Sequence, residues 1–149
     1  MKKLCLLAIC SLVLLVVAPV ALAQGNVKQG PDVVRDPEME KDALHNLEVA
    51  RQYFKLRKAY KASLARCEEI IAGNPIFSKI DEVLFIAGES SLRLSENKGK
   101  QAVKTATDKL REDARDYLSQ LVNDYPDSKF KDDAVESLKS LGGPRPKAP

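Results

Sequence analysis

The sequence predicts an all-α protein of about five helices arranged as stacked antiparallel pairs. Apolar residues recur at steps of three and four along five segments, and no segment alternates between apolar and polar residues as a strand does. Two segments about fifty residues apart, NPIFSKIDEVLFIAGESSLRL and DYPDSKFKDDAVESLKSL, also have nearly the same order of residues. Each pair has only a narrow apolar face, so pairs must stack to bury it.

Residues 1–23, MKKLCLLAICSLVLLVVAPVALA, have the parts of a secretory signal peptide. Two lysines precede an apolar run over residues 4–17, and Ala21-Leu22-Ala23 provides a small-x-small cleavage site. The run is shorter than the ~20 residues that a membrane span needs. We therefore expect an exported, periplasmic protein whose mature chain starts at Gln24, with association to the outer membrane left open.

The same segment contains a weak match to a lipobox, Leu7-Ala8-Ile9-Cys10. Ile9 is bulky where a small residue is expected, and Cys10 lies inside the apolar run, so the match is not convincing. Cleavage after residue 23 removes Cys5 and Cys10 and leaves Cys67 as the one cysteine, which excludes an intramolecular disulfide.

The mature chain is nearly neutral and has a segment without helical periodicity at each end. It has 22 basic and 21 acidic residues, so its net charge gives no reason to expect nucleic acid or an anionic membrane surface as a partner. Residues 24–35 have no period and are predicted to be a flexible leader. Residues 142–149, GGPRPKAP, are predicted to be a disordered Pro-rich tail, which leaves residues 36–141 as the helical domain.

The first two helices have clear boundaries. Asp36 is a good N-cap and Pro37 suits the first helical position, so the first helix should run to about Arg57. The second should cover about Tyr60 to Ala72, followed by Gly73 as its C′ residue. Their apolar stripes are Ala43, Leu47, Ala50 and Phe54, and then Tyr60, Leu64, Cys67 and Ile71.

The remaining three helices follow the same spacing. The third should open at Ser78 with Asp81 completing a capping box. The fourth should end before Pro126, and the fifth should start at Asp127 or Ser128. Their stripes are Ile80, Leu84, Ala87, Ser91 and Leu94; Val103, Thr107, Leu110, Ala114, Tyr117 and Leu121; and Phe130, Ala134, Leu138 and Leu141.

The segment NLEVARQYFKLRKAYKASLARCEEIIAGNP resembles a tetratricopeptide repeat, a pair of antiparallel helices with a closing proline. Arg51 lies where such a repeat usually has a small residue, and the second unit has about fourteen extra residues between its helices. The resemblance implies a short right-handed solenoid. Its matching positions are Leu47, Ala50, Phe54, Tyr60, Ser63, Cys67, Ile70 and Pro75, and then Leu84, Ala87, Gly88, Ala114, Leu118, Leu121 and Pro126.

Over about Leu47 to Leu141, the amino-acid sequence is similar to that of the BamD-like family of outer-membrane assembly lipoproteins. The resemblance implies a periplasmic scaffold in the machine that inserts β-barrel proteins into the outer membrane. It implies protein partners, either that assembly machinery or segments of outer-membrane proteins, with any membrane contact peripheral or through a partner. Family members have about five repeats, so this chain, with two and a half, resembles a short relative of that family.

The sequence offers no pattern for catalysis, for a metal or for another cofactor. His45 is the only histidine, no Cys/His/acid cluster has metal-ligand spacing, and no Gly-rich loop precedes a helix. Acids such as Glu68-Glu69 are adjacent on a helix and therefore point in different directions. We expect a protein that is not an enzyme.

What remains is a binding surface. In stacked pairs the first helices line the concave side, where peptides usually bind. Phe85 and Leu92 lie off the main stripe, so they either anchor a peptide or pack against the fifth helix or the leader. The candidate groove consists of His45, Glu48, Gln52 and Lys55 on the first helix and Glu82, Phe85, Glu89, Leu92 and Arg93 on the third.

The sequence is also compatible with two other functions. Two and a half repeats barely cover a core, so the chain could instead be a self-associating organiser, a homo-oligomer. It could also be an accessory domain of a cell-envelope enzyme complex. The extra residues 96–109 contain four lysines, Lys98, Lys100, Lys104 and Lys109, which form either a basic docking edge or a solvated start of a helix.

Overall fold

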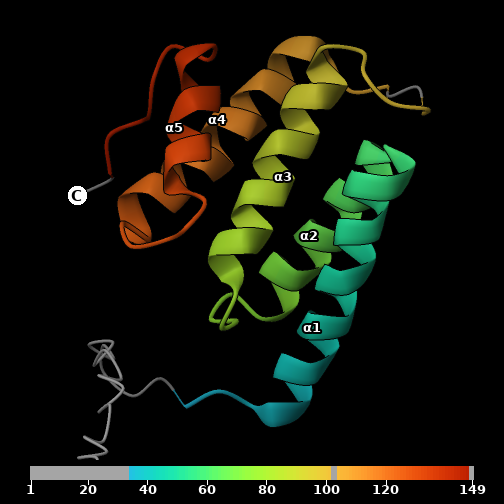
Figure 1. Cartoon of the computed structure of the whole chain (residues 1–149), viewed down its shortest axis with the longest axis vertical. Helices are drawn as coiled ribbons and strands as arrows, with labels where there is room; N and C mark the ends of the chain where they lie inside the picture. The colour runs from blue at the N-terminus through green and yellow to red at the C-terminus, as the bar shows by residue number, and fades with distance from the viewer. Residues whose placement is uncertain (1–33, 102–103, 148–149) are drawn as a thin grey trace, which may run out of the picture. The chain divides into compact units, whose positions relative to one another are not determined.

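The computed structural model describes residues 34–101 and 104–147, which form five α-helices and no strand (Figure 1). The predicted all-α fold is confirmed. The predicted signal peptide, all of the leader up to residue 33, and Val103 lie outside the described residues. The helices are α1 (Pro37–Gln52), α2 (Tyr60–Gly73), α3 (Ile80–Ser95), α4 (Thr107–Asp124) and α5 (Lys131–Lys139).

The start and end of α1 follow from local chemistry. The Asp36 carboxylate accepts hydrogen bonds from the backbone N–H groups of Glu38 and Met39, at 2.8 and 3.3 Å, and such a cap stabilises a helix by ~1 kcal/mol. Beyond Gln52 the chain continues as a π-helical turn, Tyr53–Arg57. Lys58 then takes a left-handed conformation, with φ of 50°, and ends the helical run at the predicted position.

Small residues bring α1 and α2 together. Ser63 on α2 is fully buried, and its hydroxyl donates a 3.0 Å hydrogen bond to the carbonyl oxygen of Ala50, which is also fully buried. The tetratricopeptide pattern predicted Ser63, Cys67 and Ile70 as core positions, and all three are buried. The simple periodic stripe also contained Cys67 but had Leu64 and Ile71 in place of Ser63 and Ile70, and these two side chains are only partly buried.

Helix α3 is the centre of the fold, with α2 packed on one side and α4 on the other (Figure 1). Thirteen of its 16 residues are buried. Gly88 allows α4 to approach its backbone, because a methyl group at this position would lie 2.6 Å from Cγ of Leu118. The largest fully buried side chains are Leu47, Leu84, Leu118, Leu121, Leu138 and Val83.

Two nearly identical turns explain the repeated segments. Between α2 and α3, Phe77 N–H donates to the Asn74 carbonyl and Ile80 N–H donates to the Phe77 carbonyl, both at 3.1 Å. Between α4 and α5, Ser128 N–H donates to Tyr125 and Lys131 N–H donates to Ser128, at 3.0 and 3.1 Å. The structural repeat is therefore 51 residues, the spacing of the two prolines. The two Ser-Lys pairs, 50 residues apart, are out of register by one.

These turns also correct the predicted helix starts. Ser78 does not cap α3, because its backbone N–H donates to the Glu40 carboxylate at 3.2 Å and the second turn still separates it from the helix. The equivalent pair of turns precedes α5, so this helix starts at Lys131 instead of Asp127 or Ser128. Gly73 is the last residue of α2 and not its C′ residue, and α4 starts at Thr107, so residues 96–101 and 104–106 form a loop.

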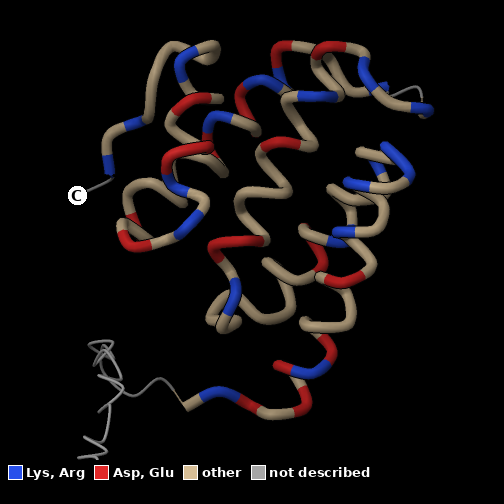
Figure 2. The backbone as a smooth tube through the Cα atoms, viewed as in Figure 1, with Lys and Arg blue, Asp and Glu red and all other residues tan. Residues whose placement is uncertain are grey.

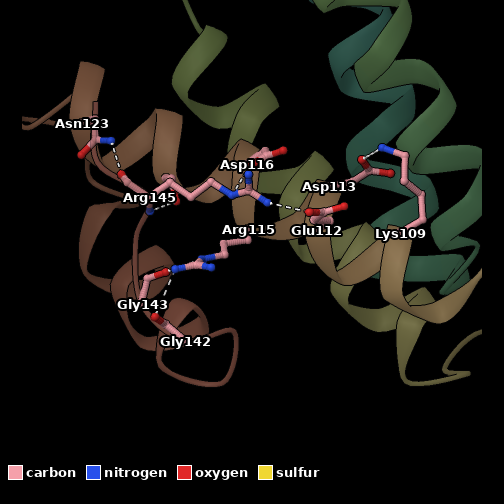
Figure 3. Close-up of polar contacts among 10 residues, drawn as sticks. Lys109, Glu112, Asp113, Arg115, Asp116, Asn123, Gly142, Gly143 and Arg145 are labelled. Carbon is pink, nitrogen blue, oxygen red and sulfur yellow. Dashed lines mark hydrogen bonds and ion pairs between the residues drawn. The ribbon is translucent and has the colours of Figure 1, made fainter. Parts of the chain in front are cut away.

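The C-terminal residues 142–147, which their composition suggests are disordered, lie along α4 (Figure 3). Gly142 and Gly143, with φ of 86° and 84°, reverse the chain after α5. The Arg115 guanidinium donates to the Gly143 carbonyl at 2.8 Å, and Arg145 N–H donates to the Ser119 hydroxyl at 2.8 Å. The Arg145 guanidinium also lies 2.7 Å from a carboxylate oxygen of Asp116.

Candidate functional site on the face of α1, α3 and α5

The first helices of the pairs, α1, α3 and α5, share one side of the domain, which we call the A-helix face (Figure 1). The four residues that the sequence assigned to the first helical run are all exposed. Three of them lie on α1 and the fourth in the π-helical turn: His45, Glu48, Gln52 and Lys55. They are polar or charged, and their spacing of three or four residues places them along one side of the helix.

The residues that the sequence assigned to α3 are mostly covered. Glu82, Glu89 and Leu92 are 9 %, 5 % and 7 % exposed, whereas Phe85 and Arg93 are half-buried. Leu92 belongs to the hydrophobic core, so it does not offer the exposed apolar anchor that the sequence suggested. Phe85 packs on the residue before α5: its ring stacks on Phe130 with centroids 5.0 Å apart, which is the alternative role expected for it.

Polar contacts join α3 to the helices on both sides of it. Arg51 on α1 donates two hydrogen bonds to the Glu82 carboxylate, at 2.6 and 2.7 Å. On the other side, the Ser128 hydroxyl donates to Asp81 at 2.6 Å, and the Ser137 hydroxyl donates to Glu89. The residues of α3 on the A-helix face are therefore fixed to α1 and α5 by buried or half-buried contacts. We call this α3 surface the floor of the A-helix face.

The pair of Arg51 and Glu82 controls the charge on this floor. Burial raises the pKa of Glu82, but the hydrogen bonds from Arg51 and its positive charge outweigh burial, so the pKa of Glu82 is lowered. Lys129 and Lys79 contribute in the same direction. The hydrogen bond to Glu82 likewise raises the pKa of Arg51. Both groups are charged at neutral pH.

A cavity of about 360 Å³ opens where the floor meets the turn between α4 and α5. The Lys129 ammonium group lies 4.8 Å from the centre of the Phe130 ring, a favourable cation–π geometry. Neither Lys79 nor Lys129 has an ion-pair partner within residues 34–101 and 104–147. The lining residues are Arg51, Lys79, Asp81, Glu82, Asp127, Ser128, Lys129 and Phe130.

Of these lining residues, only Glu82 was predicted from the sequence to belong to a site. Its missed partner, Arg51, had one visible signal: it replaces the small residue of the repeat pattern. The lysines also had a signal, since Lys79 and Lys129 both occur in the repeated segments, but nothing in the sequence placed them beside the same cavity.

The family comparison covers all five helices. The family model YfiO, described as an outer membrane lipoprotein, matches residues 35–142. The chain belongs to the YfiO family. Neither a curated protein nor a solved structure matches the chain. The match begins one residue before the N-cap of α1 and ends where the chain turns back onto α4, so the YfiO-type domain and the described helical domain coincide.

Among the described residues, no group of three or more His, Cys, Asp or Glu side chains could hold a metal ion, and no helix is long and apolar enough to cross a membrane. Burial, followed by the charges of Glu68 and Glu82, raises the pKa of the Cys67 thiol to about 12. This cysteine is a core residue, as its place on the apolar stripe predicted.

Proposed function

We propose that the chain is a non-catalytic, periplasmic scaffold that binds polypeptide segments during the assembly of outer-membrane proteins. The observation that carries the proposal is the match of the YfiO outer membrane lipoprotein model to residues 35–142, which includes every helix of the A-helix face. The periplasmic location also rests on the signal peptide predicted for residues 1–23.

The A-helix face supplies the groups that a polypeptide needs. A bound segment has backbone N–H and C=O groups and side chains of mixed charge, so polar side chains at regular spacing can fix its register. Glu48, Gln52 and Lys55 offer an acid, an amide and a base along one row, and all three are exposed. Because α1 and α5 are fixed to α3, the row is held on a rigid support, which lowers the entropy lost on binding.

The cavity at Lys79 and Lys129 adds a second contact region on the same face. Its two lysines are available to a carboxylate, and the ring of Phe130 is half-buried beside them. We propose that acidic or aromatic side chains of the bound segment occupy this cavity, while the rest of the segment runs along the exposed row of α1.

The test is binding of labelled peptides from outer-membrane β-barrel proteins to the mature chain, followed by fluorescence anisotropy. Gln52→Ala should weaken binding by about fivefold, which is ~1 kcal/mol. Gln120→Ala, a matched change at an exposed glutamine on α4, should leave binding unchanged. Equal affinities for both variants, or no binding by the unaltered chain, would remove the A-helix face as the peptide site.

A further inference from the structure

Basic residues gather at the end of the domain where α1 turns into α2. Lys55, Arg57, Lys58 and Lys61 lie in or next to this turn, and all four are exposed. The loop after α3 adds Lys98 and Lys100, which are also exposed. Figure 2 shows the two basic segments at the same end of the helices. We call these six residues the basic tip.

A small second core holds the two segments together. Tyr60, Leu94 and Leu110 form a buried cluster beneath the tip. A methyl group at Gly99 would lie 2.9 Å from Cδ2 of Tyr60 and 3.1 Å from the carbonyl oxygen of Lys58. Gly99 also has φ of 111°, a conformation that other residues rarely adopt. The loop therefore packs directly on the α1–α2 turn, and its lysines are fixed near those of the turn.

The two segments that form the basic tip contain few acids of their own. The chain has no Asp or Glu between Glu48 and Glu68, and in the loop Glu96 forms an ion pair with Lys98 at 2.9 Å. The other five basic residues make no ion pair within the described part of the chain. The mature chain is nearly neutral overall, but the basic tip has a local excess of positive charge. This excess arises because two segments about forty residues apart are in contact.

An exposed apolar side chain lies within this charge. Leu56 is 80 % exposed, in the π-helical turn between Lys55 and Arg57. Beside it, the Arg57 guanidinium lies 5.7 Å from the centre of the Tyr53 ring. Exposed leucine among basic residues suits the surface of an anionic bilayer, where cations meet the phosphate headgroups and the apolar side chain enters the headgroup boundary.

We propose that the basic tip docks on an anionic phospholipid surface, with Leu56 inserted between the headgroups. An acidic protein would satisfy the charges but would leave Leu56 exposed unless it also provided an apolar pocket, so the lipid surface accounts for both features. The proposal goes beyond the peptide scaffold and does not depend on it, since the basic tip shares only Lys55 with the A-helix face.

The experiment is co-sedimentation of the mature chain, starting at Gln24, with phosphatidylcholine vesicles that contain or lack phosphatidylglycerol. Binding should require phosphatidylglycerol and should weaken as salt is added, since salt screens surface charges. The variant Lys58→Glu/Lys100→Glu should bind at least about tenfold more weakly. The control Lys41→Glu/Lys139→Glu makes the same change of charge at exposed lysines on α1 and α5 and should bind like the unaltered chain.

A second variant tests the insertion of Leu56. Leu56→Ser should weaken vesicle binding, whereas Val135→Ser, at another exposed apolar residue, should not. Thermal melting by circular dichroism checks that each variant is folded. The proposal is overturned if the unaltered chain ignores phosphatidylglycerol or if the control reversal weakens binding equally. It is also overturned if Leu56→Ser leaves vesicle binding unchanged and poly-glutamate releases the protein from the vesicles. That result would indicate an acidic protein partner.

Discussion

The rings of Phe85 on α3 and Phe130 just before α5 stack with centroids 5.0 Å apart and planes inclined by 18°. This contact ties the start of α5 to α3. Helix α5 packs mainly on α4, has nine residues, and buries only Ala134 and Leu138 along its length. It also places an aromatic pair on the A-helix face beside the lysine-lined cavity. Stability of α5 and the shape of the candidate peptide site therefore depend on the same two rings.

Phe130→Ala should loosen α5 before the rest of the domain. Loss of the stacked pair should lower the free energy of unfolding by about 1–3 kcal/mol, less than for a fully buried ring because Phe130 is half-buried. Hydrogen exchange should become faster in the backbone amides of α5 and stay slow in α2. Phe130→Leu, which keeps an apolar side chain, should have a smaller effect, and unchanged exchange in α5 would show that the stack does not hold it.

Arg51→Met should change how stability depends on pH. With Arg51 present, the pKa of Glu82 lies below its ordinary value of 4.5, so its stabilising contribution exists above pH 4.5 and is lost as the pH falls further. Without Arg51, burial should raise that pKa above 4.5, and the remaining contribution would instead be lost as the pH rises. The cost of the substitution should therefore be greatest near neutral pH, up to about 3 kcal/mol, and should shrink towards pH 4.

Urea unfolding at a series of pH values measures this difference. The matched control is Arg66→Met, which removes an exposed ion pair with Glu69 and should cost at most about 0.5 kcal/mol at any pH. If Arg51→Met had the same small and pH-independent effect, the pair of Arg51 and Glu82 would not be the connection between α1 and α3.

Gly88→Ala should destabilise the domain although alanine favours helices. The added methyl group would lie 2.6 Å from Cγ of Leu118, so α4 would have to move, at a cost of about 1–3 kcal/mol. Gly73→Ala is the control: it is also helical, has nothing within 4 Å of the new methyl group, and should stabilise by up to ~1 kcal/mol. In a Leu118→Ala background the Gly88→Ala change should cost less, and an unchanged cost there would place the clash elsewhere.

Cys67 should be unreactive in the folded protein. Its side chain is fully buried and the pKa of its thiol is raised to about 12, so almost no thiolate is present at neutral pH. A thiol reagent should label it only as fast as the domain unfolds, and the rate should rise with urea. Rapid labelling without denaturant would mean that α2 opens locally around this residue.

Local chemistry made much of the fold predictable. Asp36 caps α1, Lys58 follows the predicted last residue of the helical run, and the tetratricopeptide pattern selected Ser63, Cys67 and Ile70 correctly because it includes the position where two helices touch. Periodicity alone predicted Leu64 and Ile71 as core residues of α2. A narrow apolar stripe does not specify which side of a helix faces a second neighbouring helix.

What the sequence could not give are contacts between distant segments. Glu40 on α1 binds the N–H of Ser78 and so prevents the capping box predicted at that serine. Arg145 reaches Asp116 and holds a tail whose composition is typical of disorder. Leu92 lies off the main stripe of α3 but is buried, because α3 has neighbours on several sides.

The central claim is that the A-helix face holds segments of outer-membrane proteins, and site-specific photo-crosslinking in intact cells tests it most directly. One photo-crosslinking residue replaces Gln52 on the A-helix face, and a matched one replaces Gln120 on α4. Crosslinks from position 52, identified by mass spectrometry as outer-membrane β-barrel proteins or their assembly machinery and absent from position 120, are the predicted result. Crosslinks to these proteins from position 120 alone, or only to a second copy of this chain from position 52, would contradict the claim.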